Sequence, residues 1–192
     1  MKVLKFGGTS VANAINISQV KDIVDQTPGD RLIVVVSALG GITDLLLKTA
    51  ELAASQDKGY QAVLKEIEER HIKTIQELIP IASQSKVLSK VKSELNILET
   101  LLEGAYLIGE ITPKLSDKIV SFGELLSSYI ISEFFIISQL DAIYKDSREL
   151  IKTNNNYGKG VVNFEVTNSN CQTYFSQSKH RITVLGGFIA SS

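Results

Sequence analysis

The chain has 192 residues, of which 44% are apolar, and this composition excludes a disordered protein and predicts one sizeable domain with a hydrophobic core. Its 20 basic and 21 acidic residues give a net charge of −1 without any Lys/Arg run, so we expect no nucleic acid but a small molecule or another protein as partner. The single cysteine, Cys171, excludes a disulfide framework, and the glycines that follow the N-terminal lysines do not resemble a secretion signal, so we expect a cytoplasmic protein.

The first 26 residues predict a strand, a glycine turn and a helix. Residues 1–6 form the strand, and Gly7 and Gly8 follow it directly. The helix is expected at 11–26, with one face carrying Ile15, Val20, Ile23 and Val24. Paired glycines let backbone N–H groups approach an anion closely, the helix directs its positive end at the same place, and Lys5 adds a positive charge. The segment therefore predicts a phosphate-binding site.

The next 30 residues repeat this pattern. A turn at 27–30 precedes the continuous apolar run 32–36, which is typical of a strand buried on both faces of a parallel sheet. Gly40 and Gly41 follow the strand, and a helix is predicted from Thr43 to about residue 55. Because the carboxyl ends of parallel strands lie at one edge of the sheet, both glycine turns are expected to face the same crevice.

Residues 57–110 have a different character, with dense charge and heptad-like apolar spacing. We predict two long antiparallel helices, at 60–78 and 85–108, joined around Pro80. The pattern indicates a helical insertion that packs on the sheet or on a second subunit.

A further helix is predicted after the Thr-Pro break at 112–113. Ser116 or Asp117 is the expected cap, and the buried face is expected to carry Ile119, Leu125, Leu126 and Ile130. The most apolar stretch, 129–140, is interrupted by polar residues and is too short to span a bilayer, so we expect no membrane association.

The last third of the chain predicts two strands and a loop. The strands are expected at 142–144 and 182–185, and a third pair of glycines, 186–187, follows the second of them. Residues 153–160 are polar and contain glycine, which predicts a loop. Residues 163–175 are weakly patterned and support no prediction.

Several common sites are absent from the sequence. It contains no P-loop, no G-x-G-x-x-G after a strand and no protein-kinase motif set. Its histidines, His71 and His180, follow charged residues and are expected at the surface, and Cys171 is expected to be an incidental thiol. No metal ligand can be assigned.

Four segments resemble, in the same order, the motifs of the aspartate kinases: residues 5–11, 35–44, 121–128 and 187–189. The resemblance implies the amino-acid-kinase (carbamate-kinase-like) fold, a three-layer α/β/α sandwich with a mainly parallel sheet. It implies transfer of the ATP γ-phosphoryl group to the side-chain carboxylate of L-aspartate, the entry to lysine, threonine and methionine synthesis. Residues 1–192 would be the N-terminal part of the catalytic domain, with the insertion at about 57–110, and are expected to be inactive alone.

The insertion resembles that of lysine- or threonine-controlled enzymes, many of which are fused to homoserine dehydrogenase. We expect a homo-oligomer. Mg²⁺ is expected because ATP is the donor, with no ligand assigned.

The residues expected to act on phosphate are predicted to face one crevice. They are Lys5, Phe6, Gly7, Gly8, Ser37, Gly40 and Gly41. Lys5 would neutralise charge on the transferring group as the catalytic residue, and the glycine N–H groups would hold phosphate or the attacking carboxylate. Ser37 is either a further donor or an ordinary hydroxyl at the end of a strand.

The substrate residues are carried over from the motifs. Thr43 and Glu124 would bind aspartate, Glu124 through the α-ammonium group. The alternatives are that Thr43 caps its helix and that Glu124 is an acid near a helix N-terminus. Arg148 either reaches the crevice or forms a structural salt bridge. The same two roles are open for Asp146.

Two other functions remain open. The chain is alternatively another amino-acid kinase, acting on glutamate, acetylglutamate or a nucleotide. It is otherwise a non-catalytic dimerisation scaffold built on the helices of 57–110.

Overall fold

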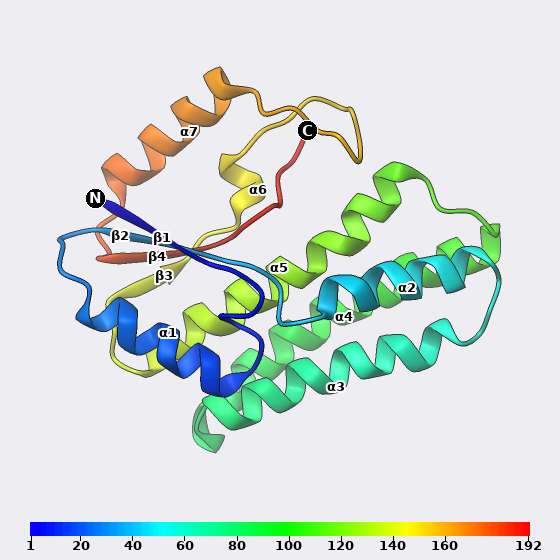
Figure 1. Cartoon of the computed structure of the whole chain (residues 1–192), viewed down its shortest axis with the longest axis horizontal. Coiled ribbons are helices and arrows are strands. Elements are labelled where there is room, and N and C mark those ends of the chain that lie inside the picture. Colours follow the sequence, from blue (N-terminus) through cyan, green and yellow to red (C-terminus); the bar gives the residue numbers. More distant parts are fainter.

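The computed structural model of the protein describes residues 1–192 and contains one four-stranded sheet between two layers of helices (Figure 1). The strands are β1 (Lys2–Phe6), β2 (Leu32–Val36), β3 (Ala142–Tyr144) and β4 (Ile182–Gly186). Their order is β1-β2-β4-β3, and every neighbouring pair is parallel. The predicted α/β fold with a parallel sheet is confirmed.

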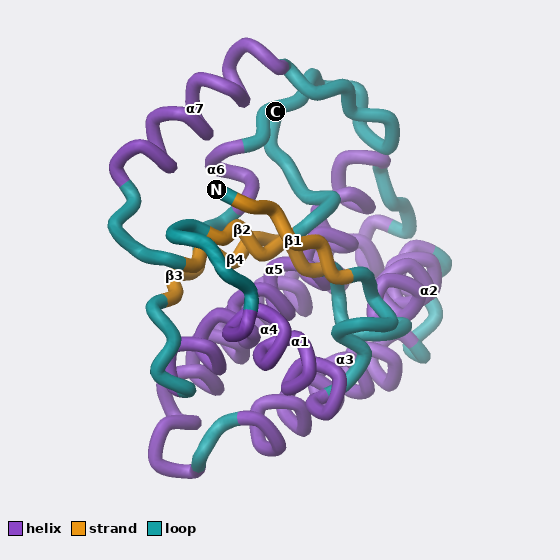
Figure 2. The backbone as a smooth tube through the Cα atoms, turned by 60° about the vertical axis from the view of Figure 1, so that its left-hand side comes forward, coloured by secondary structure: helices purple, strands orange, loops and turns teal.

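Five helices cover one face of the sheet. They are α1 (Ala14–Gln26), α2 (Ile42–Ala54), α3 (Tyr60–Leu78), α4 (Ile81–Ile108) and α5 (Pro113–Ile137). Figure 2 shows them together on one side of the strands, and they share a single large core. The helices α3 and α4 pack on each other and are joined at Pro80, as predicted, although α4 begins earlier than residue 85.

Two shorter helices cover the other face: α6 (Ser147–Leu150) and α7 (Phe164–Gln177). A small apolar cluster forms there around Ile33, Leu150 and Leu185, with Tyr174 and Phe175 packed against it. Neither helix was predicted, because α6 has a single turn and α7 lacks a strong apolar stripe. Together with α1–α5 they complete the predicted three layers (Figure 1).

The first helix differs from its prediction in start and in buried face. The side chain of Asn13 accepts a hydrogen bond from Asn16 N–H at 3.0 Å and caps α1, which therefore begins at Ala14 and not at residue 11. Ile15 and Ile23, expected to be buried, are 72% and 51% exposed. The buried stripe is Ala14, Ile17, Val20 and Val24, which follows the helical period from the true start.

The fifth helix is capped one turn earlier than predicted. The Thr112 hydroxyl accepts a hydrogen bond from Leu115 N–H at 3.2 Å, and Pro113 occupies the first helical position, so neither Ser116 nor Asp117 is the cap. The predicted buried face is confirmed. By length and composition α5 is apolar enough to cross a membrane, but 72% of its apolar window is buried inside the fold, as in the core helix of a soluble protein.

The prediction of a surface position is wrong for His71 and right for His180. His71 lies on the inner face of α3 and is fully buried, with Nδ1 2.7 Å from the Ile67 carbonyl oxygen and no partner for Nε2. Burial lowers the pKa of His71 to about 4. Its neighbours in sequence are charged, but its position follows the helical stripe. His180 is exposed beside Asp141, at 2.7 Å.

Candidate functional site

A cavity of about 990 Å³ opens at the carboxyl ends of β1, β2 and β4. Ligands bind at this edge in open α/β sheets. Six of the predicted site residues line it: Gly8, Ser37, Gly41, Thr43, Glu124 and Arg148. The other four, Lys5, Phe6, Gly7 and Gly40, lie in the same loops and strand but do not line the cavity.

The two glycine turns have free backbone donors. The N–H groups of Gly7, Gly8, Gly40 and Gly41 donate no hydrogen bond to any group of the protein. None of the four glycines is buried, so these N–H groups at one edge of the sheet are accessible, and successive free N–H groups of this kind can bind an anion. The phosphate-binding role of both turns stays a prediction.

The turns are held differently. In the first turn, the Gly7 carbonyl accepts hydrogen bonds from Ser10 N–H at 2.9 Å and Val11 N–H at 3.2 Å, and a Cβ at Gly7 would meet nothing within 4 Å. In the second turn, Gly41 has a φ of 75°, and a Cβ on Gly40 would lie 2.9 Å from the Ala12 Cβ. The second turn therefore needs its glycines for the fold itself.

Lys5 and Phe6 point to opposite faces of β1. Phe6 packs against the main core, so only its backbone is available, and its carbonyl accepts Ser37 N–H at 3.2 Å. Lys5 is in register with Val35, which packs on the side of α6 and α7, so Lys5 lies on that side. The Lys5 side chain is exposed and forms no ion pair, and is therefore free to reach an anion at the edge of the sheet.

Glu124 lies in the middle of α5 and is only 6% exposed. The alternative of an acid near a helix N-terminus is therefore wrong. Burial raises the pKa of Glu124, and hydrogen bonding to the backbone at Ala38 opposes this in part. A buried carboxylate without a cationic partner, lining a cavity, is suited to bind a cationic group of a ligand.

Small residues bring α5 close to the ends of the strands. A Cβ on Gly123 would lie 2.8 Å from the Ala38 Cβ, and a Cβ on Gly186 would lie 3.1 Å from the Glu124 Cβ. The Ser127 hydroxyl donates to the Ser37 carbonyl at 2.7 Å. These contacts fix Glu124 against the loop after β2.

Thr43 is the second residue of α2, and Gly41 occupies the cap position. The alternative that Thr43 caps this helix is therefore wrong. Thr43 lines the cavity, and its role in binding the substrate stays a prediction.

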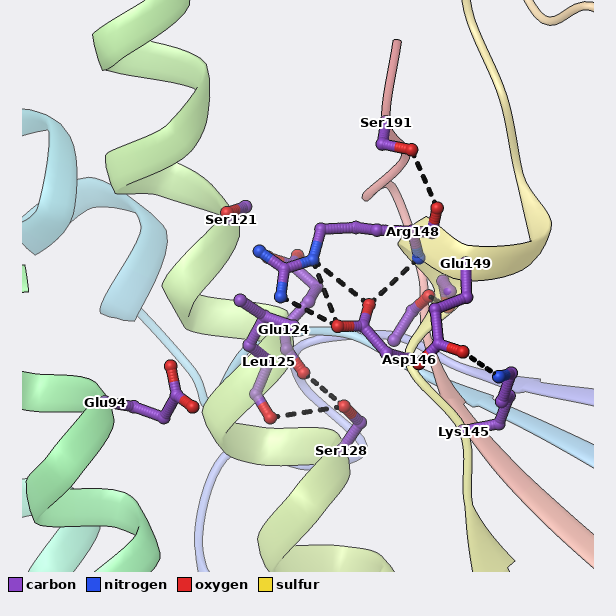
Figure 3. Close-up of polar contacts among 12 residues, drawn as sticks. Glu94, Ser121, Glu124, Leu125, Ser128, Lys145, Asp146, Arg148, Glu149 and Ser191 are labelled. Carbon is purple, nitrogen blue, oxygen red and sulfur yellow. Dashed lines mark hydrogen bonds and ion pairs between the residues drawn. The ribbon is translucent and has the colours of Figure 1, made fainter. Parts of the chain in front are cut away.

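Arg148 combines both predicted alternatives. Figure 3 shows its guanidinium extending toward α5, with the Asp146 carboxylate against it. The Asp146 carboxylate accepts from Arg148 Nη2 at 2.7 Å and from Nε at 3.1 Å, while Arg148 also lines the cavity. Burial alone would raise the pKa of Asp146, but the hydrogen bonds and charge of Arg148 outweigh it and hold that pKa below its usual value. Lys152 Nζ donates to the Arg148 carbonyl at 2.9 Å, which fixes the backbone.

The cavity lining carries four basic and two acidic side chains: Lys114, Lys118, Arg148 and Lys159 against Asp117 and Glu124. The Asp117 carboxylate already accepts a hydrogen bond from Gly158 N–H at 2.7 Å. The excess of positive charge favours an anionic ligand. The three lysines were not predicted, since they are dispersed in sequence and only the fold gathers them. The protein has no cluster of three or more His, Cys, Asp or Glu side chains that could hold a metal ion.

A model of the amino acid kinase family matches residues 1–192. The chain belongs to the amino acid kinase family. Its relatives include bifunctional aspartokinase/homoserine dehydrogenase 1 of Zea mays. The two sequences are 31% identical over 191 residues, which make up 99% of this chain and 21% of the relative. The aspartokinase of Candida albicans is 31% identical over 166 residues, 82% of the chain and 30% of the relative.

The solved structures similar to this chain include E. coli aspartokinase III in complex with lysine and aspartate. Its TM-score is 0.88 at 28% identity, covering 100% of this chain and 41% of that one. The same enzyme in complex with aspartate and ADP gives the same values. The chain spans about a fifth of the length of the bifunctional relatives that it matches.

Proposed function

We propose that the chain belongs to an aspartokinase, which transfers the γ-phosphoryl group of ATP to the side-chain carboxylate of L-aspartate. One observation carries the proposal: Gly8 and Gly41, whose N–H groups are unpaired, and the buried Glu124 line one positively charged cavity. The relatives support it, since those named above are aspartokinases and one solved structure holds aspartate and ADP. Residues 1–192 would then be the N-terminal part of the kinase domain, with its helical insertion at about 57–110.

The proposed chemistry needs positioning and charge neutralisation more than proton transfer. The attacking carboxylate is ionised at neutral pH, so no general base is required. The N–H groups of the two glycine turns would hold phosphate and carboxylate oxygens without rearranging. Lys5 would place a mobile positive charge beside the transferring group, and the Ser37 hydroxyl would add a donor from the next strand.

The aspartate would be held by its charges. Glu124 would accept hydrogen bonds from the α-ammonium group, a pairing that favours ionised Glu124 and offsets the burial that raises its pKa. Arg148, held in place by Asp146, would bind a carboxylate. Thr43 would donate from the first turn of α2.

ATP fits the donor set of the cavity, because its phosphates need N–H groups and cations and both are present. Mg²⁺ would enter with the nucleotide and be held mainly by phosphate oxygens and water, since the protein offers no carboxylate cluster for it. We further propose a cytoplasmic homo-oligomer acting at the first step of lysine, threonine and methionine synthesis, with homoserine dehydrogenase as the expected fusion partner.

The test is ADP release by the intact gene product that carries this chain, with L-aspartate and then L-glutamate as acceptor. We expect turnover with aspartate only. Lys5→Ala should lower kcat by about 10²-fold, as for the loss of one donor to a transition-state charge. Lys2→Ala is the matched control, because Lys2 is exposed at the opposite end of the same strand. Turnover with glutamate, or full activity of Lys5→Ala, would contradict the proposal.

A further inference from the structure

The turn after β2 has a central peptide with two accessible orientations. Ile42 N–H donates to the Leu39 carbonyl at 3.0 Å, which closes a four-residue β-turn with Gly40 and Gly41 at its centre. Gly41 has φ 75° and ψ 0°, the values of the third residue of a type II turn. Type I and type II turns share the outer hydrogen bond and differ by a flip of the central peptide. The orientation of the Gly40–Gly41 peptide is therefore not fixed by the turn alone.

An arginine from a distant helix holds this peptide. Arg70 lies on α3 and is half-buried, and its Nη2 donates to the Gly40 carbonyl oxygen. Its Nη1 lies 3.6 Å from the place that a Cβ on Gly41 would occupy. Arg70 forms no ion pair with any acidic side chain, and it does not line the cavity. The Gly40 carbonyl is thus the group that its guanidinium engages.

The orientation of the carbonyl determines that of the neighbouring N–H. The peptide is trans, so the Gly41 N–H points away from the Gly40 carbonyl and hence away from Arg70. Gly41 lines the cavity, and its N–H has no acceptor in the protein. A flipped peptide would instead turn the carbonyl oxygen to the side where the N–H now lies, and that oxygen would repel an anion.

We propose that Arg70 is a positioning residue, which holds the Gly40–Gly41 peptide so that the Gly41 N–H is available to a phosphate or carboxylate oxygen of the ligand. Arg70 acts from the opposite side of the turn and touches no ligand. The identity of the anion rests on the proposed function, but the orientation of the peptide does not. The helix α3 therefore does more than pack against the core, because it supports the turn at Gly40 and Gly41.

The orientation is tested without any ligand, by NMR of the ¹⁵N-labelled protein. In the observed turn the Gly40 Hα lies close to the Gly41 N–H and gives a strong nuclear Overhauser effect, which a flipped peptide loses. We expect Arg70→Met to weaken this signal and shift the Gly41 amide resonance, and Arg70→Lys to restore both in part. Lys73→Met is the matched control, an exposed residue of the same helix with a surface ion pair to Glu77 at 3.8 Å; it should change neither.

ADP with Mg²⁺ is the binding probe, measured by calorimetry on the same variants. Arg70→Met should weaken ADP binding about tenfold, comparable to the loss of one charge-assisted hydrogen bond, with partial recovery in Arg70→Lys. If Arg70→Met does not fold, Arg70→Gln, which is too short to reach Gly40, takes its place. A folded Met or Gln variant with an unchanged Gly41 signal overturns the inference. Loss of the Gly41 signal in a protein that does not phosphorylate aspartate would keep the inference and remove the proposed substrate.

Discussion

The Gly7-Gly8 turn and the Gly40-Gly41 turn follow neighbouring parallel strands, and both leave their N–H groups unpaired. The surroundings of the two turns differ. A Cβ on Gly7 would meet nothing within 4 Å, and neither Gly7 nor Gly8 has a positive φ. Gly40 lies against Ala12, its carbonyl is held by Arg70, and Gly41 has a φ of 75°.

A Gly-Gly pair therefore serves a different purpose in each turn. At the second turn, glycine is needed because the backbone and the neighbouring chain leave no room for a side chain. At the first turn the fold does not require it, and the space beside Gly7 remains open to a ligand. Substitutions at the second turn should reduce stability, whereas those at the first should reduce binding at nearly constant stability.

The largest expected effect concerns the helix that supports the second turn. His71 follows Arg70 on α3, and because its pKa is lowered to about 4 in the folded state, the unfolded state binds more protons between that pH and 6.5. Above pH 6.5 His71 is neutral in both states and does not lower the stability. As the pH falls from 6.5 to about 4, protonation of the unfolded state lowers the free energy of unfolding by about 3 kcal/mol in total. Acid should therefore loosen the second turn before the first, which amide exchange at Ile42 and Ser10 would show, because their N–H groups donate the hydrogen bonds that close the second and the first turn.

His71→Leu isolates this contribution, because it removes the titrating group from the same buried position. Urea unfolding at pH 4 and at pH 7 should show a smaller loss of stability for this variant than for the unmodified protein. Equal pH dependence of the His71→Leu variant and the unmodified protein would contradict the assignment.

The next effect tests the packing of the second turn directly. In Gly40→Ala the new Cβ would lie 2.9 Å from the Ala12 Cβ, and such overpacking should lower the free energy of unfolding by about 2 kcal/mol. Ala12→Gly in the same chain removes the opposing methyl group and should recover part of the loss. Denaturant unfolding of both single variants and the double variant gives the coupling energy, which should be close to zero if the two residues do not touch.

The sequence predicted these two turns for a local reason. Each glycine pair directly follows a short apolar strand, and the residues that signal the turn also form it. Patterns of this kind also predicted the strands, the parallel sheet and the bounds of α3. The first helix was misplaced because Asn13, and not the apolar spacing, determines where it starts.

The support of the site was not predictable in this way. Arg70 lies thirty positions from Gly40, and a charged residue on a charged helix carries no sign of the carbonyl that it will bind. The lysines of the cavity belong to α5 and to the loop at 153–160, which only the fold brings together. A structural salt bridge was one of the two roles predicted for Arg148, but its partner was not named; the partner is Asp146, only two residues away.

A smaller effect is expected at Gly41, where the backbone conformation and not a clash is the obstacle. Gly41→Ala places an L side chain at a φ of 75° and should cost about 1 kcal/mol of stability. Gly41→Asn should cost less, because asparagine tolerates the left-handed region better. Thermal unfolding of the two variants compares them, and equal stability of Gly41→Ala and the unmodified protein would mean that the turn adopts another conformation.

The smallest effect on stability is expected at Gly7, and it separates the two turns most sharply. Gly7→Ala places its Cβ in open space, so the free energy of unfolding should change by less than about 0.5 kcal/mol. If the first turn binds phosphate as proposed, the same methyl group would lie beside its unpaired N–H groups, so calorimetry should show weaker binding of ADP. Gly104→Ala is the matched control, since its Cβ also meets nothing within 4 Å but lies on α4, away from the cavity. Gly104→Ala should bind ADP normally, and because alanine favours a helix interior it should not reduce stability. If Gly7→Ala were instead as destabilising as Gly40→Ala, the first turn would need its glycines for the fold, and the distinction between a turn kept open and a turn held closed would be lost.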